Sequence, residues 1–208
     1  DLVLGNANYR PQMRGLKVPF GSYVNICGVD IVRGGDGRFC VLEDNARTPS
    51  GVSYVVENRH LTQRAFPDLM RNIGVRSVSN YGQRLAGKLT ELASGIGADP
   101  SVVLLSPGSA SETAFDQGFL ATMLGFPLAE ADDLVVSKGR VWLRAGGELE
   151  PVDVILRRVE AMLSDPLEFR GNSEVGLPGM VETARHGAVT IVNPVGAGVL
   201  DNPALIAH

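Results

Sequence analysis

The chain has little net charge, few aromatic residues and only two cysteines among its 208 residues. Lysine and arginine number 19 against 23 aspartates and glutamates, which leaves no basic field to attract a nucleic-acid backbone. Apolar runs such as 102–105 and 189–192 are far shorter than the roughly 20 residues that span a bilayer, and no signal-peptide pattern opens the chain. We therefore expect a cytoplasmic protein with no nucleic-acid partner and no membrane partner.

The two cysteines, Cys27 and Cys40, indicate a reducing compartment. On the hairpin predicted below they lie four positions out of register, about 13 Å apart along the strands. A disulfide needs a Cα separation under about 7 Å, and no CxxC pair or neighbouring histidine accompanies them. We therefore predict two buried, small apolar side chains rather than metal ligands or nucleophiles.

Glycine and proline are abundant instead, with 25 and 12 residues. They predict many tight turns, and loops that come close to a ligand. Hydrophobic residues make up 44% and charged residues 20%, as in an ordinary globular protein of one large or two small domains. Because the chain begins with Asp1 and closes on what resembles the first turn of a helix after Pro203, we expect it to be part of a longer protein.

Strand-like and helix-like signals alternate along the chain, which predicts an α/β fold. The clearest signal is a hairpin, in which strands at 23–33 and 38–44 are joined by the turn Gly34–Gly37. A short apolar strand at 102–105, a Gly/Ser loop and a helix at 112–124 predict a βα unit. The remaining elements are predicted as strands at 134–136, 141–143, 152–158 and 189–192, and as helices at 52–64, 81–92, 181–186 and from 203 onward.

Several motifs of known chemistry are incomplete or missing. Residues 82–88 match the first seven positions of a P-loop, but Leu89 stands where Ser or Thr is required and the segment has the pattern of a helix interior. We reject that motif. No GxSxG, HExxH or dinucleotide fingerprint occurs. His60 and His186 have no neighbour that completes a nucleophile–base pair, and we interpret both as surface or capping residues.

The predicted hairpin carries the most informative polar residues. With its turn at Gly34–Gly37, paired positions would sum to 71, which places Asp30 opposite Val41. Because side chains alternate along a strand, one face would hold Gly28, Asp30, Val32, Phe39, Val41, Glu43 and Asn45. Two carboxylates and an amide on an apolar face suit Mg²⁺, which prefers oxygen ligands. Spacing alone equally allows Glu43 to pair with Arg47 or Arg33 while Asp30 caps a turn.

A family resemblance is carried by two runs, GVDIVR at 28–33 and VLEDNARTPSGVSY at 41–54. Both strongly resemble the circularly permuted ATP-grasp family, type 2, whose relatives include glutathionylspermidine synthetase. Further blocks with the same likeness are Leu105–Gly108, Phe119–Ala121, Asp133–Leu134, Val152–Arg158, Asp165–Leu167 and Gly176–Gly179. The resemblance therefore covers nearly the whole chain.

This resemblance implies an α/β fold that is a partial ATP-grasp, with a hairpin metal site and an inserted βα domain like a pre-ATP-grasp domain. The ATP-grasp portion would occupy residues 1–66 and the inserted domain residues 67–150. A return segment at 151–208 would lead toward a nucleotide-binding part beyond His208. The cofactors that the family implies are ATP and Mg²⁺.

By the same resemblance, Asp30, Glu43 and Asn45 stand at the positions of the family's magnesium ligands, in agreement with the argument from the hairpin. Thr48 and Ser50 stand where glutathionylspermidine synthetase places small polar residues near the acyl substrate and its phosphate. The alternative for these two is a proline-containing turn with Ser/Thr bonds to the backbone.

The resemblance also assigns a catalytic role to Arg157 or Arg158. One of them would bind an acidic substrate or phosphate bidentately, and the other would form a surface ion pair because side chains alternate along a strand. Asn202 stands near a nucleotide-contacting position. Two departures are Gly28, where glutathionylspermidine synthetase has an arginine, and Pro203, where many permuted relatives have a lysine.

The family implies a ligase that joins a carboxylate to an amine through an acyl-phosphate. The expected partners are a small-molecule or peptide carboxylate and an amine acceptor, and a homo-oligomer is compatible with the sequence. Gly28 and Pro203 motivate a second hypothesis, a degenerate ATP-grasp scaffold that binds a peptide or protein partner without catalysis. A third, a sugar- or nucleotide-binding α/β domain, explains the βα units but not the hairpin carboxylates.

Overall fold

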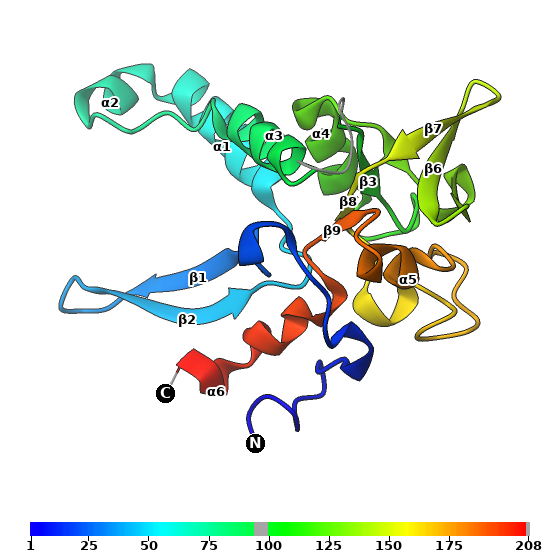
Figure 1. The fold of residues 1–208 in the computed structure, drawn as a ribbon. Helices are drawn as coiled ribbons and strands as arrows, with labels where there is room; N and C mark the ends of the chain where they lie inside the picture. The colour runs from blue at the N-terminus through cyan, green and yellow to red at the C-terminus, as the bar shows by residue number, and fades with distance from the viewer. Residues whose placement is uncertain (94–99, 207–208) are drawn as a thin grey trace.

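The computed structural model describes residues 1–93 and 100–206, which fold into a mixed α/β structure (Figure 1). Its centre is a parallel sheet in the order β4-β3-β8-β9. The strands are β3 (Val102–Leu105), β4 (Leu128–Ala129), β8 (Val154–Arg157) and β9 (Thr190–Val192). Short apolar runs of this kind are typical of a parallel sheet that is covered on both faces.

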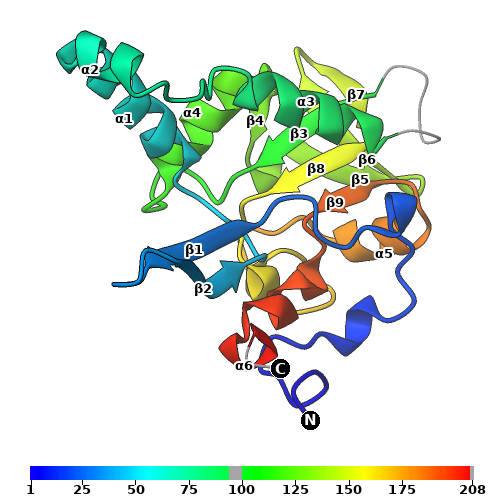
Figure 2. The ribbon, with the colours of Figure 1, turned by 90° about the vertical axis from the view of Figure 1, so that its left-hand side faces the viewer.

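Alternate residues of β3 belong to two different clusters of the hydrophobic core, one on each face of the sheet. One face is covered by α3 (Tyr81–Glu91) and α4 (Ala114–Leu124), whose leucines pack against β3 and β8. The other face is covered by a three-stranded antiparallel sheet and by α5 (Met180–Arg185). The layers lie side by side in Figure 1, and Figure 2 looks onto α3 and α4 with the parallel sheet behind them.

The antiparallel sheet has the order β5-β6-β7, with β5 (Leu134–Ser137), β6 (Arg140–Ala145) and β7 (Glu148–Val152). Only Lys138 and Gly139 join β5 to β6, with φ angles of 51° and 72°. Two positive φ angles in a two-residue turn match the right-handed twist of a hairpin, which is why glycine is favoured there.

Two parts of the chain project from the central layers (Figure 1). One is the hairpin of β1 (Gly28–Arg33) and β2 (Phe39–Asn45), and the other is an arm of α1 (Val52–Ala65) and α2 (Pro67–Asn72). The 3₁₀ turn η5 (Val195–Asp201) and α6 (Pro203–Ile206) pack against β2. The remaining short turns are η1 (Pro11–Met13), η2 (Pro19–Gly21), η3 (Ala131–Asp133) and η4 (Ala161–Leu163).

Most elements predicted from the sequence are confirmed, with ends that move by a few residues. The first hairpin strand begins at Gly28 rather than at residue 23. The strand predicted at 152–158 is interrupted at Asp153, whose carboxylate accepts a hydrogen bond from the Ser101 amide at 3.1 Å and one from Arg140 at 2.9 Å. Strands β4 and β7 were not predicted, and the P-loop-like residues 82–88 lie inside α3.

The prediction of buried cysteines is wrong, since Cys27 and Cys40 are both exposed and free. They lie at the base and near the tip of the projecting hairpin, where the described residues cover neither thiol. Their small size and apolar character therefore do not indicate their environment, which is set by how far the hairpin extends from the core.

The central sheet takes strands from both of the segments predicted as 67–150 and 151–208, because β8 pairs with β3. The predicted division at 1–66, 67–150 and 151–208 stays a prediction. The helix predicted from Pro203 is present as α6, and its continuation into residues 207–208 lies outside the described residues. Within residues 1–93 and 100–206, no helix combines the length and the apolar character that crossing a membrane requires.

Candidate functional site

Asp30 and Glu43 lie directly opposite each other in the hairpin. The predicted register, with Asp30 opposite Val41, is wrong for two reasons. The turn pairs Gly34 with Arg38, which shifts the pairing by one residue. An irregularity after Asp30 shifts it by one more, because Ile31 pairs with Val41 and Leu42 is left over. The two carboxylates are therefore direct cross-strand neighbours, an arrangement in which Cβ atoms are about 4.5–5.5 Å apart.

The two shifts also change the predicted face of the hairpin. Gly28 pairs with Asn45, so the polar half of that face is retained, whereas Phe39 and Val41 now pair with residues assigned to the opposite face. A Cβ atom at Gly28 would lie 3.2 Å from the Pro49 Cβ. A long side chain at this position would therefore require the segment around Pro49 to move, which explains the glycine in physical terms.

The polar half of this face fits a hard cation. Asp30 and Glu43 are exposed, and the Oδ1 atom of Asn45 is buried with no hydrogen-bond partner within the described chain. Neither arginine considered as a partner of Glu43 takes that role, since one pairs with Asp201 and the other donates to a turn carbonyl. An amide oxygen and two carboxylates are oxygen ligands of the kind that Mg²⁺ takes.

The hairpin side chains would supply only part of a coordination shell. Among the described residues, no group of three or more His, Cys, Asp or Glu side chains is arranged to hold a metal ion. Mg²⁺ is usually bound through one or two carboxylates, with waters and substrate phosphates as its other ligands. The donor set of this hairpin therefore suits an ion that arrives with a phosphorylated ligand.

The strap, defined as residues 46–51, connects β2 to α1 and is bound to side chains that follow the carboxyl ends of β8 and β9. Three of its carbonyl groups accept hydrogen bonds from these side chains. The bonds are Asn193 Nδ2 to Ala46 at 2.7 Å, Arg157 Nη2 to Arg47 at 3.1 Å and Arg158 Nη1 to Pro49 at 2.6 Å. The carboxyl edge of a parallel sheet is where α/β proteins commonly bind ligands.

Asp116 holds the other end of the strap. Its carboxylate is buried, with 1% of the residue exposed, and accepts hydrogen bonds from the amides of Gly51 at 3.1 Å and Ser53 at 3.0 Å. The Ser53 hydroxyl donates to the same carboxylate. Arg158 lies 3.8 Å away and supplies the opposite charge. Asp116 thus joins α4 to the end of the strap and the first turn of α1.

Both predicted catalytic arginines are buried, so the expectation that one of them forms a surface ion pair is wrong. Arg157 is 1% exposed and Arg158 is 8% exposed. Burial is the main cause that lowers the pKa of Arg157 to about 10, with the charge of Arg158 as the second cause. Burial also lowers the pKa of Arg158, and Asp116 opposes that shift. Both guanidinium groups remain charged at neutral pH and bind the strap.

Thr48 and Ser50 lie on the strap itself. Thr48 is half-buried and Ser50 is exposed, and neither hydroxyl forms a hydrogen bond to another described residue. The alternative of a turn closed by Ser/Thr bonds to the backbone is therefore not formed by these two side chains. Because the backbone on both sides is fixed by Arg157 and Arg158, the two hydroxyls are left on a rigid support.

Asn202 caps a helix. Its Oδ1 accepts a hydrogen bond from the Ala204 amide at 3.1 Å, and its Nδ2 donates to the Leu2 carbonyl at 3.4 Å. Pro203 is the first residue of α6, a position where proline is favoured because the amide there needs no partner. Nucleotide contact by Asn202 stays a prediction, and its side chain already serves the local structure.

Three residues that fix the strap were not predicted: Asp116, Asn193 and Asp201. Asp201 accepts from the Ala46 amide at 2.7 Å and pairs with Arg47. The sequence gives a weak signal for two of them. Asn193 directly follows an apolar strand, and Asp116 lies in a mostly apolar helix. Polar residues in such places are commonly buried against a specific partner.

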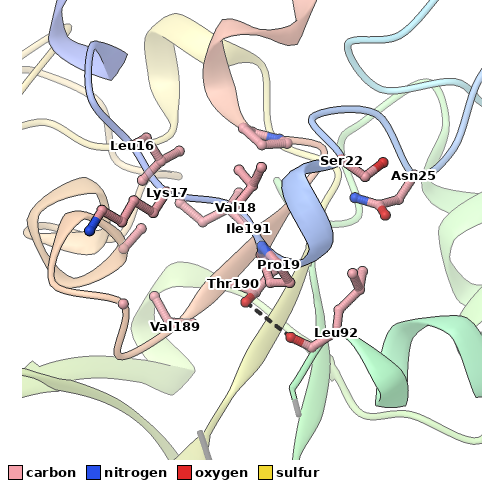
Figure 3. Close-up of a pocket in the computed structure, with 13 residues that line it drawn as sticks. Leu16, Lys17, Val18, Pro19, Ser22, Asn25, Leu92, Val189, Thr190 and Ile191 are labelled. Atoms are coloured by element: carbon pink, nitrogen blue, oxygen red, sulfur yellow. Dashed lines mark hydrogen bonds between the residues drawn. The ribbon is translucent and has the colours of Figure 1, made fainter. Parts of the chain in front are cut away.

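A separate cavity of about 280 Å³ lies beside the outer edge of β9 (Figure 3). The segment with Leu16, Val18 and Pro19 forms one wall, and the Thr190 hydroxyl donates to the Leu92 carbonyl at 3.3 Å on the other side. Lys17 is the one charged residue among those that line it. This cavity does not include the strap or the hairpin carboxylates.

Comparison with known proteins identifies related chains. A family model described as circularly permuted ATP-grasp type 2 matches residues 1–208. The uncharacterized protein Rv2567 of Mycobacterium tuberculosis is 41% identical over 206 residues, which are 99% of this chain and 23% of the relative. The uncharacterized protein sll0335 of Synechocystis sp. is 39% identical over 208 residues, which are 100% of this chain and 43% of the relative.

A further relative, the uncharacterized protein Rv2411c of Mycobacterium tuberculosis, is 39% identical over 207 residues, which are 100% of this chain and 38% of the relative. The chain thus spans less than half the length of each of these curated relatives. Kinship to glutathionylspermidine synthetase stays a prediction.

Proposed function

The chain belongs to the circularly permuted ATP-grasp type 2 family, and we propose that its protein is an ATP- and magnesium-dependent ligase that joins a carboxylate to an amine. The observation that carries this proposal is the direct opposition of Asp30 and Glu43 beside the unpartnered amide oxygen of Asn45. Family membership supports ATP-dependent ligation in general. The choice of carboxylate and amine, and the acyl-phosphate route, are parts of our proposal.

In this proposal Asp30, Glu43 and Asn45 hold Mg²⁺ at the base of the hairpin. A bound Mg²⁺ ion neutralises charge that develops on phosphate oxygens during phosphoryl transfer. The opposed carboxylates attract the ion, and the Asn45 oxygen gains the partner that the described chain does not supply. The exposed position of the carboxylates leaves room for the phosphate oxygens that complete the shell.

The strap positions the acyl substrate. Thr48 and Ser50 orient the carboxylate and its phosphate through their hydroxyl groups. Arg157 and Arg158 bind the carbonyls of Arg47 and Pro49, the residues that directly precede Thr48 and Ser50. Holding reactants in place contributes much of the rate in such reactions, since the chemistry needs little from the protein beyond positioning and charge.

The proposed reaction has two steps. A carboxylate oxygen of the substrate attacks the γ-phosphorus of ATP, the bond to the β-phosphate oxygen breaks, and ADP leaves with that electron pair. The amine nitrogen then attacks the acyl carbon of the acyl-phosphate, inorganic phosphate leaves, and the amine loses a proton. Overall, ATP, a carboxylate and an amine give ADP, phosphate and an amide.

The test replaces Glu43 by alanine in the full protein and measures magnesium-dependent ADP release with a panel of amino acids and short peptides as carboxylate donors. We expect Glu43→Ala to abolish this release without changing the unfolding midpoint, because Glu43 is exposed. Glu148→Ala, at an exposed carboxylate of β7, is the matched control and keeps full activity. Unchanged turnover in Glu43→Ala contradicts the assignment of the metal site.

Titration calorimetry with Mg-ATP separates the ligase from a scaffold that has lost catalysis. The ligase requires nucleotide binding that depends on Mg²⁺ and weakens in Glu43→Ala. A scaffold need not bind Mg-ATP at all, so an absence of binding in the wild-type protein favours the scaffold.

A further inference from the structure

We propose that a groove between α3 and the segment 25–27 binds an acidic peptide, as the carboxylate substrate of the ligase proposed above. The groove has a volume of about 760 Å³ and is lined by residues of α3 on one side and by Asn25, Ile26 and Cys27 on the other. Figures 1 and 2 show the chain before β1 passing below α3. Small-molecule sites commonly have volumes of roughly 300–1,000 Å³.

The wall formed by α3 carries two cations, Arg84 and Lys88, and one anion, Glu91. Arg84 and Lys88 are four positions apart, so they lie on the same side of the helix, while Leu85 and Leu89 face the core. Arg84 is exposed and forms no ion pair with another described residue. A guanidinium group in this position is available for a bidentate contact with a carboxylate.

Lys88 has a weak local partner. Its ammonium lies 3.2 Å from Glu91 and 5.2 Å from the centre of the Phe20 ring. An exposed pair three residues apart on a helix contributes little to stability, about 0–1 kcal/mol. Lys88 can therefore exchange this contact for a ligand carboxylate, and Phe20 keeps its stem close to the groove.

The opposite wall is held by the same residue that holds the strap. Asn193 Oδ1 accepts hydrogen bonds from the amides of Asn25 at 3.0 Å and Ile26 at 3.2 Å, and its Nδ2 donates to the Ile26 carbonyl at 2.7 Å. This Nδ2 also donates to the Ala46 carbonyl. The wall and the strap therefore have a fixed relation to each other.

One end of the groove lies near the strap. Cys27 lines the groove and precedes Gly28, where an added Cβ atom would lie 3.2 Å from the Pro49 Cβ of the strap. Tyr81 lines the groove as well, and its pKa is raised mainly by burial and lowered in part by Arg158, which binds the same strap. A peptide bound along Arg84 and Lys88 would thus extend toward Thr48 and Ser50.

The net charge of the chain does not attract an acidic peptide. The net charge is -4, so the overall field of the chain repels an acidic peptide. Binding of such a peptide therefore requires a local cluster of cations. Arg84 and Lys88 supply that cluster within the groove.

The test measures the Kd of fluorescein-labelled tetraglutamate for the full protein by fluorescence polarisation, in EDTA and without nucleotide. We expect binding that weakens at least about fivefold in Arg84→Gln, since a hydrogen bond between charged groups is lost. Arg64→Gln, which removes the same charge from the exposed end of α1, is the matched control and leaves the Kd unchanged. Equal binding of tetralysine, or an unchanged Kd in Arg84→Gln, overturns the proposal.

The two cysteines give a second, local readout. Cys27 lines the groove and Cys40 lies on the hairpin, and both are exposed. We expect tetraglutamate to slow alkylation of Cys27 by iodoacetamide while Cys40 reacts at its usual rate, as quantified by peptide mass spectrometry. Equal rates at Cys27 with and without peptide overturn the location. Because neither assay contains ATP or Mg²⁺, a failed ligase assay and a failed peptide assay are distinguishable.

Discussion

Replacing Asp116 by asparagine tests whether this buried carboxylate holds the strap. The substitution keeps the shape of the side chain but removes its charge and turns one acceptor oxygen into an NH₂ donor. The amides of Gly51 and Ser53 each donate to a different oxygen of this carboxylate, so one of them meets a donor in the variant. Arg158, 8% exposed, also loses its opposite charge.

The expected loss of unfolding free energy in Asp116→Asn is about 3–5 kcal/mol, the usual effect of removing one member of a buried ion pair. This figure already includes the lost hydrogen bonds. Each bond to a charged group contributes roughly 1.5–3 kcal/mol, and these contributions are not summed because they are not additive. The matched control is Asp68→Asn, which breaks an exposed pair with Arg71 on α2. Its expected loss is about 0.5 kcal/mol or less.

The assay is urea unfolding followed by the fluorescence of Trp142, the one tryptophan of the sequence. A loss below about 1 kcal/mol in Asp116→Asn, near that of the control, would refute the reasoning, since a buried pair would then behave as an exposed one. Should Asp116→Asn not fold, Ser53→Ala removes only the hydroxyl donor to Asp116. Its expected loss is about 1 kcal/mol, and no loss at all would refute the same argument.

Two further predictions concern single side chains. Asn193→Ala removes the donor and acceptor that join the strap to segment 25–27. The unfolding free energy should fall by about 2–4 kcal/mol in the same assay, because buried backbone groups lose their partners. A fall within the error of the measurement would be incompatible with that role. Within α3, Gly87→Ala meets no atom within 4 Å and should raise the unfolding free energy by about 0.5–1 kcal/mol through better helix propensity. Gly82→Ala places a Cβ 2.7 Å from Met123 Cγ and should lower it, and a stabilised Gly82→Ala would contradict the packing between α3 and α4.

The elements whose sequence pattern is local could be predicted. The apolar run of β3 and the leucines of α3 mark a buried strand and an amphipathic helix, and both are found within one residue of the predicted ends. The turn at Lys138 and Gly139 is likewise a local signal. The shared position of Asp30 and Glu43 on one hairpin face followed from the alternation of side chains, although their register did not.

Features that depend on distant residues could not be predicted. The bulge at Leu42 changes the hairpin register, and nothing in the neighbouring residues marks it. The burial of Arg157 and Arg158 follows from carbonyl acceptors that lie 110 and 109 positions earlier in the chain. The exposure of Cys27 and Cys40 follows from the projection of the hairpin, which local composition does not specify.

The wide sequence separation of the strap's partners has a consequence for synthesis of the chain. Ala46 is bound by Asn193, 147 positions later, and by Asp201, 155 positions later. A ribosome adds residues from the N-terminus at about 5–20 per second, so the hairpin and the strap emerge many seconds before either partner exists. Contacts of such separation also form late because closing long loops is entropically unfavourable. During that interval the strap of a nascent chain has neither of these partners, and the arrival of Asn193 and Asp201 ends it.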